Sequence, residues 1–122
     1  MISQEQADRF ATEWIAAWNA HDLDAIVAHY AEDVSFVSPF VAALTGEESA
    51  RIEGRAALRE YFRLGLEAYP DLHFDLFTAL AGASSIALHY RSVGGRLAIE
   101  TMELDAEGFV VGASAHYSAP QD

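Results

Sequence analysis

One segment near the start of the chain constrains its fold more than any other. Residues 14–39 read WIAAWNAHDLDAIVAHYAEDVSFVSP. Trp14 and Trp18 are four residues apart, a spacing that places two side chains on one face of a helix. Residues 19–21 then break that helix. A second, short helix is predicted to run to Tyr30, and an alternating strand over 34–38 stops at Pro39, which lacks a backbone donor.

The first predicted helix begins with a capping pattern. Ser3 is followed three residues later by Gln6, as in a capping box. The apolar residues behind it recur at the i, i+3, i+4, i+7 spacing of one buried helix face. This stripe comprises Ala7, Phe10, Ala11, Trp14, Ala17 and Trp18. Asp22 is placed to cap the second helix, because an aspartate side chain accepts from the backbone N–H groups of a first turn.

A third helix is predicted from Glu53-Gly54 to about Tyr69, with Pro70 beyond its end. Its expected buried face comprises Ala57, Leu58, Tyr61, Phe62 and Leu66. Between the first strand and this helix, residues 40–52 show no clear periodicity. We expect them to form a loop over one mouth of the fold.

The C-terminal part of the chain predicts a four-stranded antiparallel meander. The expected strands are residues 72–80, 85–93, 96–104 and 109–117. Gly94-Gly95 between the middle two strands is typical of a two-residue type I′ hairpin turn. Helices followed by a meander, with one early strand, indicate an α+β fold. The length of 122 residues suits a single domain over residues 1–122.

Charge and composition exclude several classes of function. Seven basic against nineteen acidic residues give a net charge of −12, which repels nucleic-acid phosphates and anionic membrane surfaces. The absence of cysteine excludes disulfides, thiolate catalysis and Cys-ligated zinc. The first residues lack the features of a signal peptide, and no apolar run approaches the roughly 18 residues of a membrane span. We therefore expect a cytoplasmic protein with no nucleic-acid or membrane partner, no metal and no other cofactor.

The predicted hairpin brings two ionisable residues together. A two-residue turn at 94–95 sets His89 opposite Glu100, at a cross-strand separation that permits a hydrogen bond. Arg91 and Met102 fall on the same face, and Ala113 is expected opposite Glu100 on the last strand, where a small residue leaves room. The other face of the hairpin would carry Leu88, Tyr90, Leu97 and Ile99. A polar sheet face is also what solvent exposure produces, so His89, Arg91 and Glu100 can equally form a solvated ladder.

Three segments together resemble the NTF2-like superfamily, in its SnoaL-like and ketosteroid-isomerase-like branch. They are residues 14–39, the sequence IEGRAALREYF at 52–62 and YPDLHF at 69–74. The resemblance implies a cone, in which three N-terminal helices pack in a curved, mixed, mostly antiparallel sheet around a ligand cavity. It also implies an inward Glu100, because ketosteroid isomerases carry the protonated acid of their oxyanion hole at the matching strand position.

The resemblance does not carry the full chemistry of a ketosteroid isomerase. It places Ser38 where those enzymes have a carboxylate base and Trp14 where they have a tyrosine. A serine hydroxyl cannot abstract a carbon-bound proton near neutral pH without a base of its own. An authentic ketosteroid isomerase is therefore not expected. The limonene-epoxide-hydrolase pattern is also incomplete, because Ala98 stands at its arginine position.

Of these three enzyme classes, the SnoaL-type polyketide cyclases agree best with the residues of this chain. They use an inward carboxylate as general acid and base with a histidine nearby, and Glu100 and His89 are the candidates for these catalytic roles. Candidate ligand-binding residues are Trp14, Tyr30, Phe36, Ser38, Phe62, Arg91, Met102 and Tyr117. We expect a small, largely apolar organic ligand and a homodimer that covers the apolar outer sheet face. The alternative is a non-catalytic ligand-binding or dimerisation module.

Overall fold

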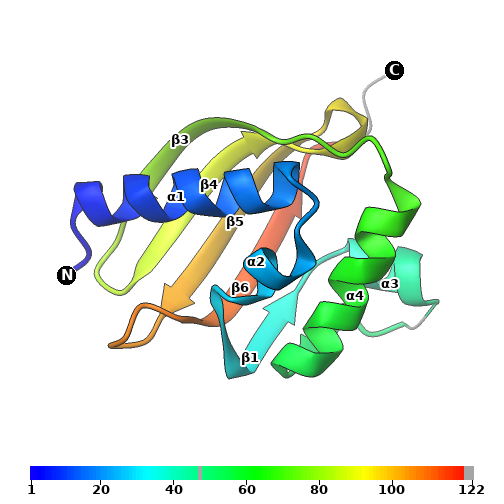
Figure 1. Ribbon diagram of the computed structural model, residues 1–122, viewed down its shortest axis with the longest axis horizontal. Coiled ribbons are helices and arrows are strands. Elements are labelled where there is room, and N and C mark those ends of the chain that lie inside the picture. The colour runs from blue at the N-terminus through cyan, green and yellow to red at the C-terminus, as the bar shows by residue number, and fades with distance from the viewer. Residues whose placement is uncertain (47, 120–122) are drawn as a thin grey trace.

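The computed structural model describes residues 1–46 and 48–119, which form helices packed on one six-stranded sheet (Figure 1). The helices are α1 (Gln4–Asn19), α2 (Leu23–Val27), α3 (Phe40–Thr45) and α4 (Arg55–Ala68). The strands are β1 (Tyr30–Val37), β2 (Arg51–Glu53), β3 (Asp75–Ala81), β4 (Ser85–Arg91), β5 (Leu97–Leu104) and β6 (Val110–Tyr117). Helix α1 crosses one face of the meander and packs on β3, while α4 packs on β1 (Figure 1).

The sheet has the strand order β2-β1-β6-β5-β4-β3. Strands β3 to β6 form the predicted antiparallel meander, and only the β1–β6 pair is parallel among the pairs of the described strands. The predicted α+β class, with N-terminal helices on a mixed, mostly antiparallel sheet, is thus confirmed. None of the helices in residues 1–46 and 48–119 has the length and apolar character that crossing a bilayer requires.

The start of α1 agrees with its sequence pattern. The backbone N–H of Gln6 donates to Ser3 Oγ at 3.0 Å, and all six residues of the predicted stripe are buried. His21 follows the helix with a positive φ of 55°, and Asp22 caps α2 by accepting from Ala25 N at 3.1 Å. The prediction that this helix reaches Tyr30 is wrong. Tyr30 instead begins β1, since pairing with β6 satisfies its backbone better than another half turn.

Residues 40–52 are not the loop that was expected. They contain α3, which buries Val41, and β2, which pairs antiparallel with β1; residue 47 lies outside the described residues. Strand β2 covers the edge of β1 that β6 leaves open, and so protects it from unwanted pairing. Both elements are too short to repeat an apolar period, so no periodicity predicts them.

Helix α4 buries Leu58, Tyr61 and Phe62 as predicted, while Leu66 is half-buried. The prediction for Ala57 is wrong, because this residue lies on the exposed side of the helix. An α-helix turns by about 100° per residue, so a neighbour of Leu58 in sequence points well away from it.

Strand β3 contains an irregularity that interrupts its alternation of buried and exposed residues. Its register with β4 shifts between Leu76 and Thr78, as at a β-bulge, where one additional residue lies on one strand. Beyond the bulge the faces are exchanged, so Ala79 is buried and Leu80 is 56% exposed.

The β4–β5 hairpin also differs from the prediction, by one residue. Ser92 N donates to Arg96 O at 2.7 Å, so the connection is the three-residue turn Val93–Gly95 rather than a two-residue turn. The pairs are accordingly Leu88 with Glu100 and His89 with Ile99. A shift of one residue exchanges the two faces of a strand. The predicted pair of His89 with Glu100 is wrong.

The new register decides which side chains of β4 enter the core. Leu88 and Tyr90, expected outside, are buried, and they share the inner face with Glu100, which is 3% exposed. On β6, Ala115 rather than Ala113 is the direct partner of Glu100. The acid is thus surrounded by an apolar face.

Candidate ligand-binding site

A cavity of about 60 Å³ lies between α1, α4 and the inner face of the sheet. Its wall is largely aromatic and includes Trp14, Trp18, Phe36, Phe62, Tyr90 and Tyr117. Glu100 is the one acid that lines it, and no basic side chain does so among the described residues. Aromatic walls with a few polar groups are typical of sites for small organic molecules.

A wider groove of about 470 Å³ adjoins this cavity. The two share Tyr69, Leu72, Ser92 and Val93 as lining residues. The groove is more polar, and His73 Nε2 lies 3.2 Å from Asp75 Oδ1 at its edge. Within residues 1–46 and 48–119, no group of three or more His, Cys, Asp or Glu side chains could hold a metal ion.

The two carboxyl oxygens of Glu100 differ in their hydrogen bonding. Tyr90 donates its hydroxyl proton to Oε1 at 3.1 Å, whereas Oε2 is buried without a hydrogen-bonding partner in the described part of the chain. Burial raises the pKa of Glu100 to about 7, and the hydrogen bond from Tyr90 partly opposes this rise. Near neutral pH the acid therefore exists in both protonation states, and it can give or take a proton.

Further hydroxyl groups extend from this acid. The hydroxyl of Tyr117 interacts with those of Tyr90 and Ser38, and the hydroxyl of Tyr61 also interacts with Ser38. Burial raises the pKa of Tyr61 to about 12, and burial followed by the charge of Glu100 raises the pKa of Tyr117 above its ordinary value. These phenols consequently stay protonated at neutral pH and can donate hydrogen bonds.

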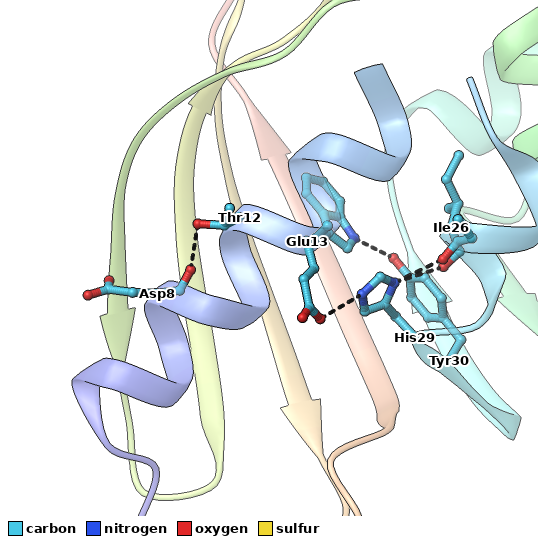
Figure 2. A network of polar contacts seen from close by, with 8 residues as sticks. Asp8, Thr12, Glu13, Ile26, His29 and Tyr30 are labelled. Carbon is cyan, nitrogen blue, oxygen red and sulfur yellow. Dashed lines mark hydrogen bonds and ion pairs between the residues drawn. The ribbon is translucent and has the colours of Figure 1, made fainter. Parts of the chain in front are cut away.

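The two tryptophans of α1 differ in how their N–H groups are used. Trp14 Nε1 donates to the hydroxyl of buried Tyr30 at 3.0 Å (Figure 2), so its ring forms a wall while its proton is engaged. Trp18 Nε1 is buried without a partner among the described residues. His29, which precedes Tyr30 in the chain, makes separate contacts: its Nε2 lies 3.9 Å from Glu13 Oε2 of α1 (Figure 2).

The structure brings many, but not all, of the predicted site residues together. Those that line the cavity are Trp14, Phe36, Phe62, Glu100 and Tyr117. Ser38 is fully buried next to Tyr61 and Tyr117. Tyr30 and Met102 are buried in the core but are not part of the cavity wall.

His89 and Arg91 lie on the opposite side of the sheet from Glu100, which corrects their predicted place beside it. The ring of His89 contacts that of Phe77 at 5.1 Å between centroids. The guanidinium of Arg91 lies 5.5 Å from the centre of the same ring and donates to Gly95 O at 2.9 Å. Both positions follow from the three-residue turn.

Trp18 and Tyr90 are two of the cavity residues that were not predicted as site residues. Trp18 appeared only as part of a core stripe, and nothing in a stripe tells which N–H lacks a partner. Tyr90 was expected outside because of the assumed turn. A signal for it existed in the alternation of Ile86, Leu88 and Tyr90, an apolar series that predicts an inward face without any assumption about the turn.

The fold and its enclosed acid define a small α+β cone with an internal cavity, and comparison with known proteins gives its family. Residues 11–117 match the SnoaL-like domain, so the chain belongs to this family, within the NTF2-like superfamily. No curated protein matches the sequence.

Solved structures support this assignment. A SnoaL-like protein of unknown function from Burkholderia thailandensis is 46% identical, with 97% of this chain and 98% of that chain covered and a TM-score of 0.92. A proposed ketosteroid isomerase from Kribbella flavida shares 22% identity over 98% and 82% of the two chains, with a TM-score of 0.74. The epoxide hydrolase/cyclase-like enzyme SalBIII, described for pyran ring formation in the polyether salinomycin, shares 21% over 97% and 95%, also at 0.74. At these lower identities the likeness concerns the fold alone.

Proposed function

We propose that this chain binds a small, neutral, largely apolar organic molecule in the aromatic cavity and transfers protons on it through Glu100. The observation that carries the proposal is the carboxyl group of Glu100, a residue of the cavity wall. Its Oε2 is buried without a partner among the described residues, while its Oε1 accepts from Tyr90. A shielded acid with a raised pKa is what general acid/base catalysis near neutral pH requires.

The proposed chemistry is an isomerase-like or cyclase-like proton transfer next to a carbonyl group. Glu100 gives a proton or removes one, and Tyr90 stabilises its ionised form by donating to Oε1. Tyr117 stays protonated nearby and can donate to negative charge that develops on a substrate oxygen. Tyr90 and Tyr117 thereby have the role beside Glu100 that was predicted for His89.

The cavity also indicates which ligands are disfavoured. No lysine, arginine or histidine lines the inner cavity among the described residues, and the net charge of the chain is −12, so an anionic group would meet repulsion there without a compensating charge. His73 and Arg91 line only the adjoining groove. A ligand too long for the inner cavity can extend into the adjoining groove past Tyr69 and Val93, which both spaces share.

Proton transfer can be tested without knowing the natural substrate. Acetophenone has exchangeable methyl protons next to its carbonyl, and their replacement in D₂O is followed by proton NMR. We expect the wild-type protein to accelerate this exchange above the buffer rate, Glu100→Gln to lose the acceleration, and His89→Ala to keep it. Equal exchange rates with wild type and Glu100→Gln would contradict a catalytic Glu100.

A second function, a binding module without catalysis, is favoured by one observation. Glu100 is the only acid or base on the cavity wall within the described residues, whereas proton shuttling between two positions often uses a pair. This function predicts that acetophenone binds, with a Kd that Glu100→Gln changes, while its exchange rate stays at the buffer value.

We also propose that two copies of the chain associate through the outer face of the sheet. Phe77, Leu97 and Ile99 are 48%, 39% and 48% exposed there, an apolar surface of the kind that assembly covers. Light scattering should give twice the chain mass for the wild type. Ile99→Glu should give the single-chain mass, whereas Ala16→Glu on the exposed side of α1 should not. A wild-type monomer would contradict this proposal.

A further inference from the structure

Two buried side-chain atoms lack a hydrogen-bonding partner in residues 1–46 and 48–119, and both belong to residues of the cavity wall. They are Trp18 Nε1 and Glu100 Oε2. Buried polar groups in folded proteins are nearly always paired, because an unpaired one keeps the full cost of its lost hydration. One of these two atoms can only donate, and the other belongs to a carboxyl group that accepts or donates according to its protonation.

The lack of a partner for Trp18 Nε1 is not a general property of the tryptophans of α1. The two residues lie one turn apart on the same face, and both rings line the cavity. Trp14 has a protein partner for its N–H in the Tyr30 hydroxyl, at 3.0 Å. The family resemblance places Trp14 where ketosteroid isomerases have a tyrosine, but the indole proton of Trp14 is already donated to Tyr30. Of the two indole N–H groups, only that of Trp18 has no partner among the described residues.

The ring of Trp18 is held firmly in place. Its centroid lies 4.8 Å from that of Phe62 in an edge-to-face contact and 5.4 Å from that of Phe74. The residue is 7% exposed, so a different rotamer would have to displace two aromatic neighbours in a close-packed core. Its N–H group therefore keeps a fixed direction, which is what a group that selects a ligand needs.

We propose that Trp18 is a ligand-binding residue that determines specificity, donating its indole N–H to a hydrogen-bond acceptor of the ligand while Glu100 holds a second polar group of the same molecule. The inference rests on the proposed function and narrows its ligand class. The ligand is a neutral cyclic compound with a carbonyl or ether oxygen and a separate hydroxyl or carbonyl group. A purely apolar molecule would leave both protein atoms unpaired and bind more weakly.

Matched pairs of small phenols test this inference directly. The probes are 3- and 4-hydroxyacetophenone, each paired with the ethylphenol in which a CH₂ group replaces the carbonyl. We expect the better of the two ketones to bind the wild-type protein about tenfold more tightly than its ethylphenol, as one added hydrogen bond implies. Calorimetry should show that Trp18→Phe, which keeps a ring but removes the N–H, abolishes this preference. The matched variant Trp14→Phe removes the other indole N–H. Because Trp14 also lines the cavity, both of its affinities can change, but their ratio should stay at the wild-type value.

NMR gives a second readout that needs no change at Trp18. The chain contains two tryptophans, so a ¹⁵N-labelled sample has two indole N–H signals, which the spectrum of either variant or the NOE contacts of the wild type assign. Adding the ketone should move the Trp18 signal downfield and leave the Trp14 signal nearly unchanged, whereas the ethylphenol should move neither downfield.

The possible failures are distinguishable. A preference for the ketone that survives in Trp18→Phe, or a downfield shift of the Trp14 signal instead, would overturn the role of Trp18 and leave the proposed function standing. If no probe binds the wild type, or if Glu100→Gln changes the affinity for neither the ketone nor the ethylphenol, the proposed function is wrong. This inference is then wrong as well.

Discussion

The inner and outer faces of the β4–β5 hairpin place similar side chains in opposite environments. On the inner face Leu88 and Tyr90 are almost completely buried beside Glu100, while on the outer face Leu97 and Ile99 are 39% and 48% exposed. The ionisable side chains do not decide which face is buried. The apolar residues of β4 determine which face is buried, and Glu100 of β5 lies on that same face.

The largest expected effect contrasts a leucine on each face. Leu88→Ala should lower the free energy of unfolding by about 3 kcal/mol, because a fully buried leucine leaves a cavity when truncated. Leu97→Ala on the outer face should cost about 0.5 kcal/mol in the monomer. Urea unfolding followed by tryptophan fluorescence measures both. The reverse order would mean that the hairpin has the register of a two-residue turn.

A second prediction concerns the pH dependence of stability. The pKa of Glu100 is raised in the folded protein, to about 7 from an ordinary value of 4.5, so the folded state holds a proton that the unfolded state releases between these values. The free energy of unfolding therefore falls as the pH rises from about 4.5 to 7. Its total decrease from this group is about 3 kcal/mol, an order-of-magnitude figure.

Glu100→Gln should remove this part of the pH dependence. The variant should be more stable than the wild type above pH 7, and the two should converge below pH 4.5, as measured by urea unfolding across the pH range. Glu103→Gln is the matched control, since Glu103 is an exposed acid three residues further along the same strand. A wild type and Glu100→Gln with parallel stability profiles would show that Glu100 is hydrated in solution.

The smallest expected effect on stability concerns the turn that sets the register of the hairpin. Gly94 has a φ of 66° and no atom within 4 Å of the position that a Cβ would take. Gly94→Ala should therefore cost about 1 kcal/mol from backbone strain alone. Gly112→Ala in β6 meets only ordinary contacts and should cost nothing measurable. Thermal unfolding distinguishes these cases, and equal melting temperatures would show that the turn tolerates a side chain.

The parts of the fold that local rules determine were predictable from the sequence. The cap at Ser3, the apolar stripe of α1 and the position of the Gly94-Gly95 turn all depend on residues close together in the chain. Register was not predictable in the same way, because glycines at 94 and 95 suit both a two-residue and a three-residue connection. The bulge near Phe77 escaped prediction for a similar reason, since no residue type marks it.

The candidate site shows the same division. Its aromatic wall and Glu100 were anticipated because large apolar residues and an inward strand position can be read from periodicity and family resemblance. The partners of Glu100 were not, because Tyr90 replaced His89 when the register moved by one residue. The free N–H of Trp18 depends on which atoms in distant segments fail to reach it, and such an absence leaves no trace in the sequence.

The parallel pairing of β1 with β6 has a consequence for the order in which the molecule assembles. Strand β6 lies between β1 and β5, so the β1–β2 pair cannot join the meander until the sixth strand has been synthesised. Most of the chain is therefore synthesised between β1 and its partner β6. Pairing of strands so far apart in the sequence is a slow step in folding. We expect the amides of β1 that face β6 to become protected together with β6, and no earlier, in pulse-labelled hydrogen exchange during refolding. Their earlier protection would mean that β1 docks on the helices before the sheet is complete.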